Sequence, residues 1–165
     1  MRVRNVHERT FAATSSEVGR LVDSLASDDD RLWPRDRWPA MRFDRPLAVG
    51  AVGGHGPIRY VVETYAPGES IRFRFTGPRG FDGFHAFQVD IVDGRAARLR
   101  HELVMTTHQL AIVSWPLVFR PLHDALIEDA LDRAAESLGE APRRATWSPW
   151  VRALRSALSR FSRRP

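Results

Sequence analysis

The sequence predicts an α+β domain in which one curved antiparallel sheet wraps around a long helix near the C-terminus. Two hairpin signals lie in a run of alternating polar and apolar residues, and a long amphipathic segment follows them. A short capped helix is expected near the start of the chain. Because a meander of strands cannot bury its inner face against itself, the long helix must lie across that face. The 165 residues are enough for one domain with a sizeable core.

The first strand and the first helix are expected within the first 30 residues. Residues 2–12 alternate and are rich in β-forming side chains, which predicts a strand. Thr14 and Glu17 have the spacing of a capping box, and apolar residues at helical intervals predict a helix over residues 15–26. The three aspartates at 28–30 should end this helix, since negative charge is unfavourable at a helix C-terminus.

Residues 31–57 are expected to be largely irregular. Pro34 and Pro39 force the tryptophans before them into extended geometry and exclude a helix interior. One strand is expected between residues 41 and 52, and a glycine-rich loop is expected over 50–56. This loop lacks the register of a dinucleotide-binding fingerprint and no helix follows it, so we interpret it as a mobile loop over the mouth of a pocket.

Two hairpins and a closing helix are expected after that loop. The turn Pro67-Gly68 joins the strands of the first hairpin, and Asp93-Gly94 joins those of the second. The expected strands cover residues 58–65, 70–76, 84–92 and 97–107. The closing helix is expected over residues 117–138, with Pro121 in its first turn or kinking it and Gly139 ending it. Its buried stripe should be Phe119, His123, Ile127, Ala130, Ala134 and Leu138.

Strand alternation assigns the side chains that should face the closing helix. In the first hairpin, pairing of Tyr65 with Ser70 sets Glu63 opposite Arg72 on the outer face. The inward residues are then Ile58, Tyr60, Val62, Thr64, Ile71, Phe73 and Phe75. In the second hairpin we expect a three-residue loop, because a two-residue loop would bury three charged side chains. The inward residues are then His85, Phe87, Val89, Ile91, Leu99, His101, Leu103 and Met105.

The inward face and the closing helix together predict a mostly apolar pocket with a few polar groups, which is typical of a small-molecule site. The residues expected to bind the ligand are Tyr60, Phe73, Phe75, His85, Phe87, His101, Leu103, Met105, Trp115, Phe119, His123 and Ile127. Trp33 and Trp38 are expected near the rim with Trp115.

Composition excludes several kinds of chemistry. The chain has no cysteine and no lysine, which rules out disulfides, thiolate nucleophiles, cysteine metal sites, Walker A loops and Schiff-base lysines. No signal peptide is expected at the N-terminus. The apolar stretch over residues 110–119 is too short to cross a hydrocarbon core of about 30 Å. A cytoplasmic protein is therefore the default expectation.

Charge divides the chain near residue 140. Residues 1–140 hold 18 arginines and all 20 acidic residues, whereas residues 141–165 hold 7 arginines and no acid. We expect a ligand-binding domain over 1–140 and an Arg-rich tail over 141–165. From Trp150 the tail has the pattern of a basic amphipathic helix, suited to an anionic membrane surface through residues 147–164 or to docking on the domain or a partner. Nucleic acid is not expected as a partner, because the tail is short and the rest of the chain is net acidic.

The chain resembles a known superfamily in its element order, in the hairpin sequence YAPGESIRFRF at 65–75 and in the closing segment WPLVFRPLHDALIEDAL at 115–131. It is similar to START-like proteins, also called SRPBCC, in their polyketide cyclase/dehydrase and lipid-transport branch. The resemblance covers about residues 2–139. It implies a helix-grip fold whose internal cavity takes lipids, sterols, polyketides or hormones. It carries over no catalytic residue, and fold alone does not determine function.

The inward histidines admit three interpretations. His85, His101 and His123 could hold a metal together, but no short ligand spacing supports this and no acidic residue is expected on that face, so we expect no metal. His85 or His101 could act as an acid or base on a polyketide-like substrate. Either could instead anchor a ligand hydroxyl or be a core histidine with an internal partner.

Two functions remain open from the sequence. The first is a protein that binds or carries a hydrophobic small molecule such as a lipid or polyketide. The second is a cyclase, dehydrase or isomerase that works without a cofactor. We favour the first, because no nucleophile, carboxylate pair or cofactor loop is visible.

Overall fold

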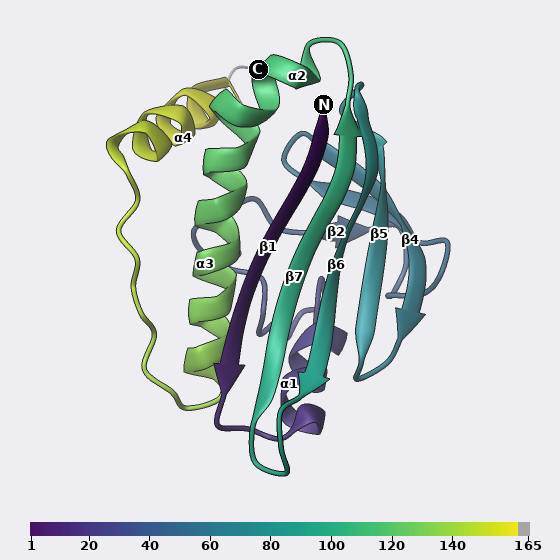
Figure 1. Cartoon of the computed structure of the whole chain (residues 1–165), viewed down its shortest axis with the longest axis vertical. Coiled ribbons are helices and arrows are strands. Elements are labelled where there is room, and N and C mark those ends of the chain that lie inside the picture. The colour runs from purple at the N-terminus through teal and green to yellow at the C-terminus, as the bar shows by residue number, and fades with distance from the viewer. Residues whose placement is uncertain (162–165) are drawn as a thin grey trace.

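Seven antiparallel strands form one curved sheet in the computed structural model, which describes residues 1–161 and the side chains of residues 1–158. The strand order is β1-β7-β6-β5-β4-β3-β2, and the longest helix, α3, lies across one face of the sheet (Figure 1). The strands are β1 (Arg2–Phe11), β2 (Arg42–Phe43), β3 (Val52–His55), β4 (Ile58–Ala66), β5 (Ser70–Gly77), β6 (Phe81–Ile91) and β7 (Ala97–Thr107). The predicted α+β architecture is confirmed.

The first helix, α1 (Ser15–Asp23), begins with the predicted capping box. The Thr14 hydroxyl accepts a hydrogen bond from the Glu17 amide at 3.3 Å, and the Glu17 carboxylate accepts one from the Thr14 amide at 2.8 Å. The helix ends at Asp23, earlier than predicted. Ala26 has a φ of 61°, and the Asp30 carboxylate accepts hydrogen bonds from the Ala26, Leu32 and Trp33 amides. The aspartate run therefore organises the loop after the helix.

The segment before the first hairpin holds two short strands, whereas one was predicted. β2 pairs with β3 through Arg42–Gly54 and Phe43–Gly53. A Cβ atom on Gly53 would lie 2.1 Å from the Arg42 carbonyl oxygen, and one on Gly54 would lie 2.0 Å from that of Ile58. Only glycine allows the backbones to approach this closely. The glycines expected to form a loop thus form much of β3, which ends at His55.

The first hairpin differs from its predicted register next to the turn, where Ala66 pairs with Ser70 and Tyr65 pairs with Ile71. The turn therefore holds three residues rather than four. A β-bulge between Val62 and Thr64 absorbs this shift, and beyond it Val62 pairs with Phe73 as the predicted register requires. The bulge reverses the facing of the residues after it, so Thr64 is exposed instead of inward. The Glu63 carboxylate lies closer to Arg74, at 2.5 Å, than to Arg72, at 4.0 Å.

The second hairpin has the predicted register. His85 pairs with Leu103 and Phe87 pairs with His101, and both histidines are buried. The Val92 amide donates to the Ala96 carbonyl at 3.0 Å, which leaves the expected three residues, 93–95, in the loop. Alternation holds from one end of β7 to the other, since every second residue is buried. Ile91 departs from the prediction because it lies at the open end of β6 and is exposed.

The closing helical segment starts earlier than predicted and is irregular where it starts. It consists of α2 (Ala111–Ser114), the π-helical turn η1 (Trp115–Phe119) and α3 (Arg120–Ser137). Pro116 and Pro121 each lack a backbone N–H, so the helical ladder cannot be regular around them. Ile127, Ala130 and Ala134 are buried as predicted, and Phe119, His123 and Leu138 are partly buried. Gly139 follows with a φ of 78°, as predicted for a helix-ending glycine.

The C-terminal segment runs back along α3 and ends in the helix α4 (Pro149–Phe161), at the end of the molecule where β1 begins (Figure 1). Val151 is buried in the main core, and Leu154 packs against that core. The Asp132 carboxylate accepts hydrogen bonds from the Arg143 and Arg144 amides, both at 2.9 Å. In the part of the chain that the structure describes, no helix is both long and apolar enough to span a membrane.

Candidate functional site

A cavity of about 300 Å³ lies between the sheet and the closing helices. Its walls come from the loop at 33–39, from β3 to β7, and from η1, α3 and α4. The lining residues are mostly apolar or aromatic: Trp33, Trp38, Pro39, His55, Gly56, Pro57, Ile58, Phe75, Phe81, His85, His101, Leu103, Trp115, Val118, Phe119, Leu122, His123, Leu126, Ile127 and Leu158. Apart from the tryptophan indoles, its polar side-chain groups are those of four histidines.

The structure brings most of the predicted ligand-binding residues to this cavity. Those that line it are Phe75, His85, His101, Leu103, Trp115, Phe119, His123 and Ile127. The others, Tyr60, Phe73, Phe87 and Met105, are buried but lie outside its lining. Phe73 and Tyr60 pack on the His85 ring, with ring centroids 4.9 Å apart in each case, and Phe87 packs on His101 at 4.7 Å. These aromatic rings therefore support the histidines from behind.

Sequence reasoning missed several lining residues. His55, expected within a loop, is the last residue of β3; it lines the cavity and packs on Trp33 with ring centroids 4.7 Å apart. Leu122 and Leu126 are not among the predicted ligand-binding residues, because the prediction took a single row of α3 as its buried face, whereas the buried face is wider. The two tryptophan–proline pairs, at 33–34 and 38–39, are the sequence feature that indicates the cavity rim, and both tryptophans line the cavity.

Three of the cavity histidines lie in a row. The Nδ1 atom of His85 lies 3.3 Å from Nε2 of His101, and the ring centroids of His101 and His123 are 5.0 Å apart. Nε2 of His85, Nδ1 of His101 and Nε2 of His123 have no hydrogen-bond partner among the described residues, whereas Nδ1 of His123 lies 3.5 Å from the Asp124 carboxylate. The row therefore offers donors and acceptors to a molecule in the cavity.

Burial keeps these histidines neutral. It lowers the pKa of His85 and of His101 well below the ordinary value, and neighbouring imidazoles lower both further. The pKa of His123 is also lowered, mainly by burial. Burial lowers the pKa of His55 to about 3, and its Nδ1 lies 3.1 Å from the Tyr60 hydroxyl. Each ring can then donate one hydrogen bond and accept another.

A fifth histidine, His7 on β1, lies outside the cavity and has the opposite electrostatics. Its Nδ1 lies 2.8 Å from the Glu128 carboxylate, and its Nε2 lies 3.2 Å from that of Asp124. Burial disfavours its charge, but these two carboxylates outweigh burial and raise the pKa of His7. Burial likewise opposes the charge of Asp124, but hydrogen bonds from His123, His7 and Asn5 lower its pKa. His7 thus favours the charged form, in contrast to the cavity row.

His85, His101 and His123 do not form a group with metal-ligand geometry. Within residues 1–161, the set of side chains whose ligand atoms lie within 4.8 Å of one another is His7, His123 and Asp124. The Asp124 carboxylate in that set already accepts a hydrogen bond from Asn5 at 2.8 Å. Glu128 holds the other nitrogen of His7. The contacts of this set are those of an ion-pair network.

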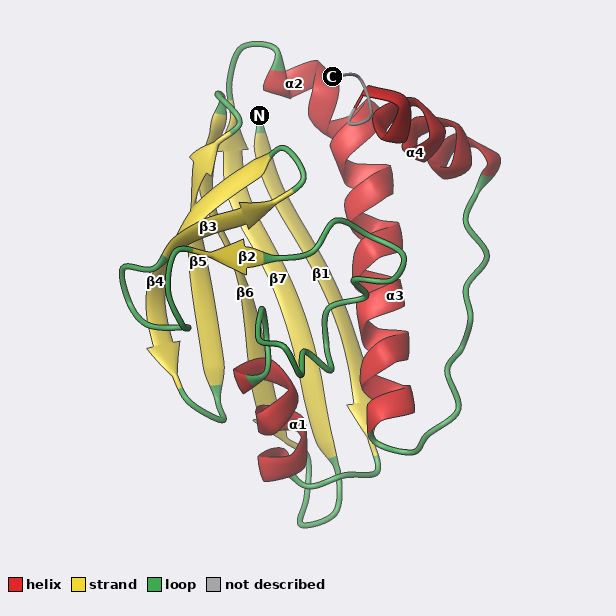
Figure 2. Cartoon of the chain, turned by 180° about the vertical axis from the view of Figure 1, so that it is seen from behind, coloured by secondary structure: helices red, strands yellow, loops and turns green. Residues whose placement is uncertain are grey.

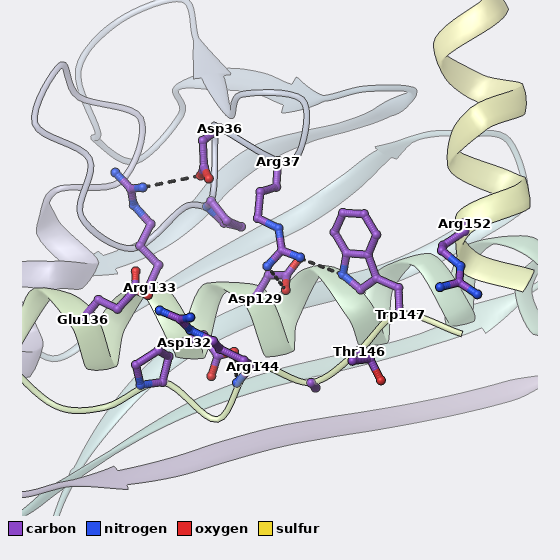
Figure 3. Close-up of a pocket in the computed structure, with 13 residues that line it drawn as sticks. Asp36, Arg37, Asp129, Asp132, Arg133, Glu136, Arg144, Thr146, Trp147 and Arg152 are labelled. Atoms are coloured by element: carbon purple, nitrogen blue, oxygen red, sulfur yellow. Dashed lines mark hydrogen bonds and ion pairs between the residues drawn. The ribbon is translucent and has the colours of Figure 1, made fainter. Parts of the chain in front are cut away.

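A second cavity, of about 450 Å³, opens on the surface between α3, the loop at 34–37 and the connector at 142–147 (Figure 3). Several of its charged groups are paired with one another. Arg37 and Trp147 donate to the Asp129 carboxylate at 2.8 and 3.0 Å, and Arg133 lies 3.6 Å from Asp36. The Trp147 contact holds the connector on the domain, and the two arginine contacts hold the loop at 34–37 on α3. The interior cavity, with its partnerless histidine nitrogens, is therefore the better candidate site.

Comparison with known proteins identifies the fold. No family model and no curated protein sequence matches the chain. Among solved structures, a norcoclaurine synthase point mutant from Thalictrum flavum has a TM-score of 0.63 at 14% identity, covering 84% of this chain and 96% of that one. CalU16 from Micromonospora echinospora has a TM-score of 0.59 at 15% identity, covering 96% of this chain and 84% of that one. The chain shares the helix-grip fold of these structures. The resemblance seen in the sequence is thereby confirmed for the fold.

The helix-grip fold accounts for the position of the cavity. A curved sheet and a helix that crosses its concave face enclose space that side chains fill only in part. A third neighbour, conserved protein EF2215 of unknown function from Enterococcus faecalis, has a TM-score of 0.59 at 13% identity, covering 97% of this chain and 86% of that one. At such identities the similarity extends to the fold and stops there.

Proposed function

We propose that this protein binds an apolar small molecule that carries a hydrogen-bonding group, in the cavity between the sheet and α3. The observation that supports this most directly is the row of His85, His101 and His123 along an otherwise apolar wall. A cavity of about 300 Å³ is at the small end of the range for ligand sites, roughly 300 to 1,000 Å³. A compact, ring-containing ligand suits it better than a long acyl chain.

The unpaired histidine nitrogens support a ligand with a hydroxyl or carbonyl group. Leaving a buried donor or acceptor without a partner costs about 1 to 3 kcal/mol. His101 is 1% exposed and its Nδ1 has no partner among the described residues, so a ligand oxygen there would recover part of that cost. A ligand without polar groups would leave the row unsatisfied.

One structural neighbour is compatible with this ligand class. A norcoclaurine synthase from Thalictrum flavum was solved in complex with dopamine and hydroxybenzaldehyde. Both molecules are aromatic rings that bear hydroxyl groups. This chain has aromatic cavity walls and imidazole donors and acceptors, which suit molecules of that kind.

An enzyme that uses His85 or His101 as acid or base is the second candidate function. The contact between His85 and His101 at 3.3 Å favours it, because one imidazole could relay a proton to the other. The lowered pKa of each histidine argues against it, since general acid–base catalysis works best with a pKa near the operating pH. We therefore favour binding over catalysis.

Native mass spectrometry of the purified protein, followed by denaturing extraction, tests the proposal. We expect a stoichiometric small molecule, or uptake of a hydroxylated aromatic probe such as a naphthol. His101→Leu should weaken binding about tenfold, the equivalent of one hydrogen bond of about 1.4 kcal/mol. His108→Leu is the matched control, because His108 is exposed and outside the cavity. An empty protein that ignores both lipids and aromatic probes would refute the proposal.

The same histidines separate the two candidate functions. If His85→Ala and His101→Ala keep ligand affinity but abolish turnover of a bound carbonyl compound, the protein is an enzyme. If either variant weakens binding and no turnover is found with the parent protein, the histidines anchor the ligand.

Membrane contact through residues 147–164 remains a prediction. Val151 and Leu154 of the expected apolar face pack on the domain, and Leu158 lines the cavity. Trp150 is the member of that face with the most exposed side chain among residues 147–158.

A further inference from the structure

Exposed apolar side chains gather at one end of the molecule. Large hydrophobic side chains are exposed in α2, in η1 and in the first turn of α4. We call this group the apolar tip; its members are Leu110, Ile112, Val113, Leu117 and Trp150. Leu110 is 85% exposed and Trp150 is 53% exposed. Clusters of this kind on a protein surface usually mark an interaction site.

The members of the apolar tip lie together. Leu110, Val113 and Leu117 recur at intervals of three and four residues, which places them on one side of a helical segment. The Trp150 indole N–H donates to the Leu117 carbonyl at 2.8 Å and so joins α4 to η1. Figures 1 and 2 both show α2 and α4 at the end of the molecule where the N-terminus lies.

The same segment also contacts the cavity. Trp115 is 3% exposed and lines the cavity, as do Val118 and Phe119. Residues 110–119 are therefore apolar on both sides, with one side inside the domain and the other exposed. The apolar residues on the inner side close the cavity, but those on the outer side have no such role within the domain.

The charge around the apolar tip is positive. Residues 78–81, 105–120 and 149–158 include no acidic residue, and they contribute the exposed arginines Arg79, Arg120 and Arg152. Of these, Arg120 also lies 3.7 Å from the Asp124 carboxylate, and Arg152 also lines the second cavity. Arg79 belongs to this end because the His108 amide donates to the neighbouring Gly80 carbonyl at 2.9 Å. Asp82 is the acidic residue that follows the first of these segments.

We propose that the apolar tip docks on an anionic membrane surface. Leucine and valine side chains would enter the boundary between headgroups and acyl chains, Trp150 would lie at that boundary, and the arginines would meet anionic headgroups. A second copy of the chain is a poorer partner, because a twofold interface would bring the same arginines face to face. This contact differs from the one predicted for residues 147–164, since α2 and η1 supply most of it.

Vesicle flotation with the full chain tests the proposal. We expect binding to vesicles of phosphatidylcholine and phosphatidylglycerol, weaker binding to phosphatidylcholine alone, and release by salt. Val113→Asp should reduce binding to the anionic vesicles at least about tenfold, given the apolar area it removes. Ile91→Asp is the matched control, because Ile91 is 74% exposed but lies in the β6–β7 hairpin, away from α2. This control should bind as the parent protein does.

Three results would overturn the proposal. The first is a parent protein that does not bind the anionic vesicles, and the second is equal loss in Val113→Asp and Ile91→Asp. The third is a concentration-dependent dimer that Val113→Asp dissociates, measured by light scattering, because it would identify a second copy as the occupant. Circular dichroism and the melting temperature establish that each variant is folded. These outcomes do not depend on ligand uptake, so the proposal can fail while the ligand-binding function stands.

Discussion

Asp129 on α3 links the cavity rim to the C-terminal segment, and its removal should be strongly destabilising. Its carboxylate accepts hydrogen bonds from the Trp38 indole at 2.7 Å, the Trp147 indole at 3.0 Å and Arg37 at 2.8 Å. Asp129 and Trp38 are both buried. Figure 3 shows Arg37 and Trp147 converging on this carboxylate. Asp129→Ala would leave the Trp38 N–H buried without an acceptor.

The magnitude follows from the contacts that would be lost. A hydrogen bond to a charged group contributes about 1.5 to 3 kcal/mol, and an unpaired buried donor costs about 1 to 3 kcal/mol. Because Arg37 and Trp147 are partly exposed and would regain water, we expect Asp129→Ala to lower the free energy of unfolding by about 3 to 5 kcal/mol. Burial raises the pKa of Asp129, so a neutral side chain is tolerated there. Asp129→Asn should therefore cost less, about 1 to 2 kcal/mol, since its amide oxygen still accepts from one or two donors.

Urea unfolding followed by circular dichroism measures these differences. Asp36→Ala is the matched control, because Asp36 is 63% exposed and lies 3.6 Å from Arg133 in the same surface cavity. An exposed ion pair of that kind contributes at most about 1 kcal/mol. If Asp129→Ala were no more destabilising than Asp36→Ala, Asp129 would not hold these three segments together.

Three further outcomes are expected. The lowered pKa of His55, His85, His101 and His123 means that the unfolded chain binds more protons, so the stability they contribute should be present above about pH 6.5 and be lost as the pH falls below it. His7, whose pKa is raised, contributes in the opposite direction. Urea unfolding measured across this pH range should show a shallower loss of stability in acid for His85→Leu than for the parent protein; an equal loss would contradict this account. Leu126 lines the cavity, so Leu126→Phe should fill it and block ligand uptake while lowering the free energy of unfolding by less than about 1 kcal/mol. Leu131 lies in packed core on the same helix, so Leu131→Phe should lower it by about 1 to 3 kcal/mol. Equal losses of stability would argue against the cavity. Gly19→Ala places a Cβ atom 2.2 Å from the Gly68 carbonyl oxygen and should lower the melting temperature sharply, whereas Gly94→Ala, with no atom within 4 Å, should leave it unchanged.

Some features could be predicted from the sequence because the cost of burying charged side chains excluded the alternatives. In the second hairpin a shift of one residue would have buried Arg98, Arg100 and Glu102, so alternation fixed the facing of β6 and β7. That assignment placed His85 and His101 on neighbouring strands with their side chains inward. The capping box at Thr14 and the terminating Gly139 were equally local signals.

Other features depended on contacts between distant segments. The bulge after Val62 leaves no mark in the alternation, so Thr64 was assigned to the wrong face. The edge strand β3 needs glycine only because other backbone segments approach it, which made Gly53 and Gly54 look like a loop. An amphipathic helix has the same pattern whether it covers a membrane or its own domain, so the packing of Val151 on the core was not predictable.

The pairing of β1 with β7 has a consequence for the order in which the chain folds. Arg2 pairs with Thr106 and Phe11 pairs with Ala97, so β1 leaves the ribosome before its partner β7 has been synthesised. During that interval β1 presents unpaired backbone groups that other chains could bind. Such distant pairing also slows folding, because the entropy of closing a long loop must be lost before the contacts form. Destabilising substitutions in β1 should therefore mainly raise the unfolding rate and change the folding rate little, because β1 is expected to pair after the β6–β7 hairpin has formed. Folding and unfolding rates of such variants would test this.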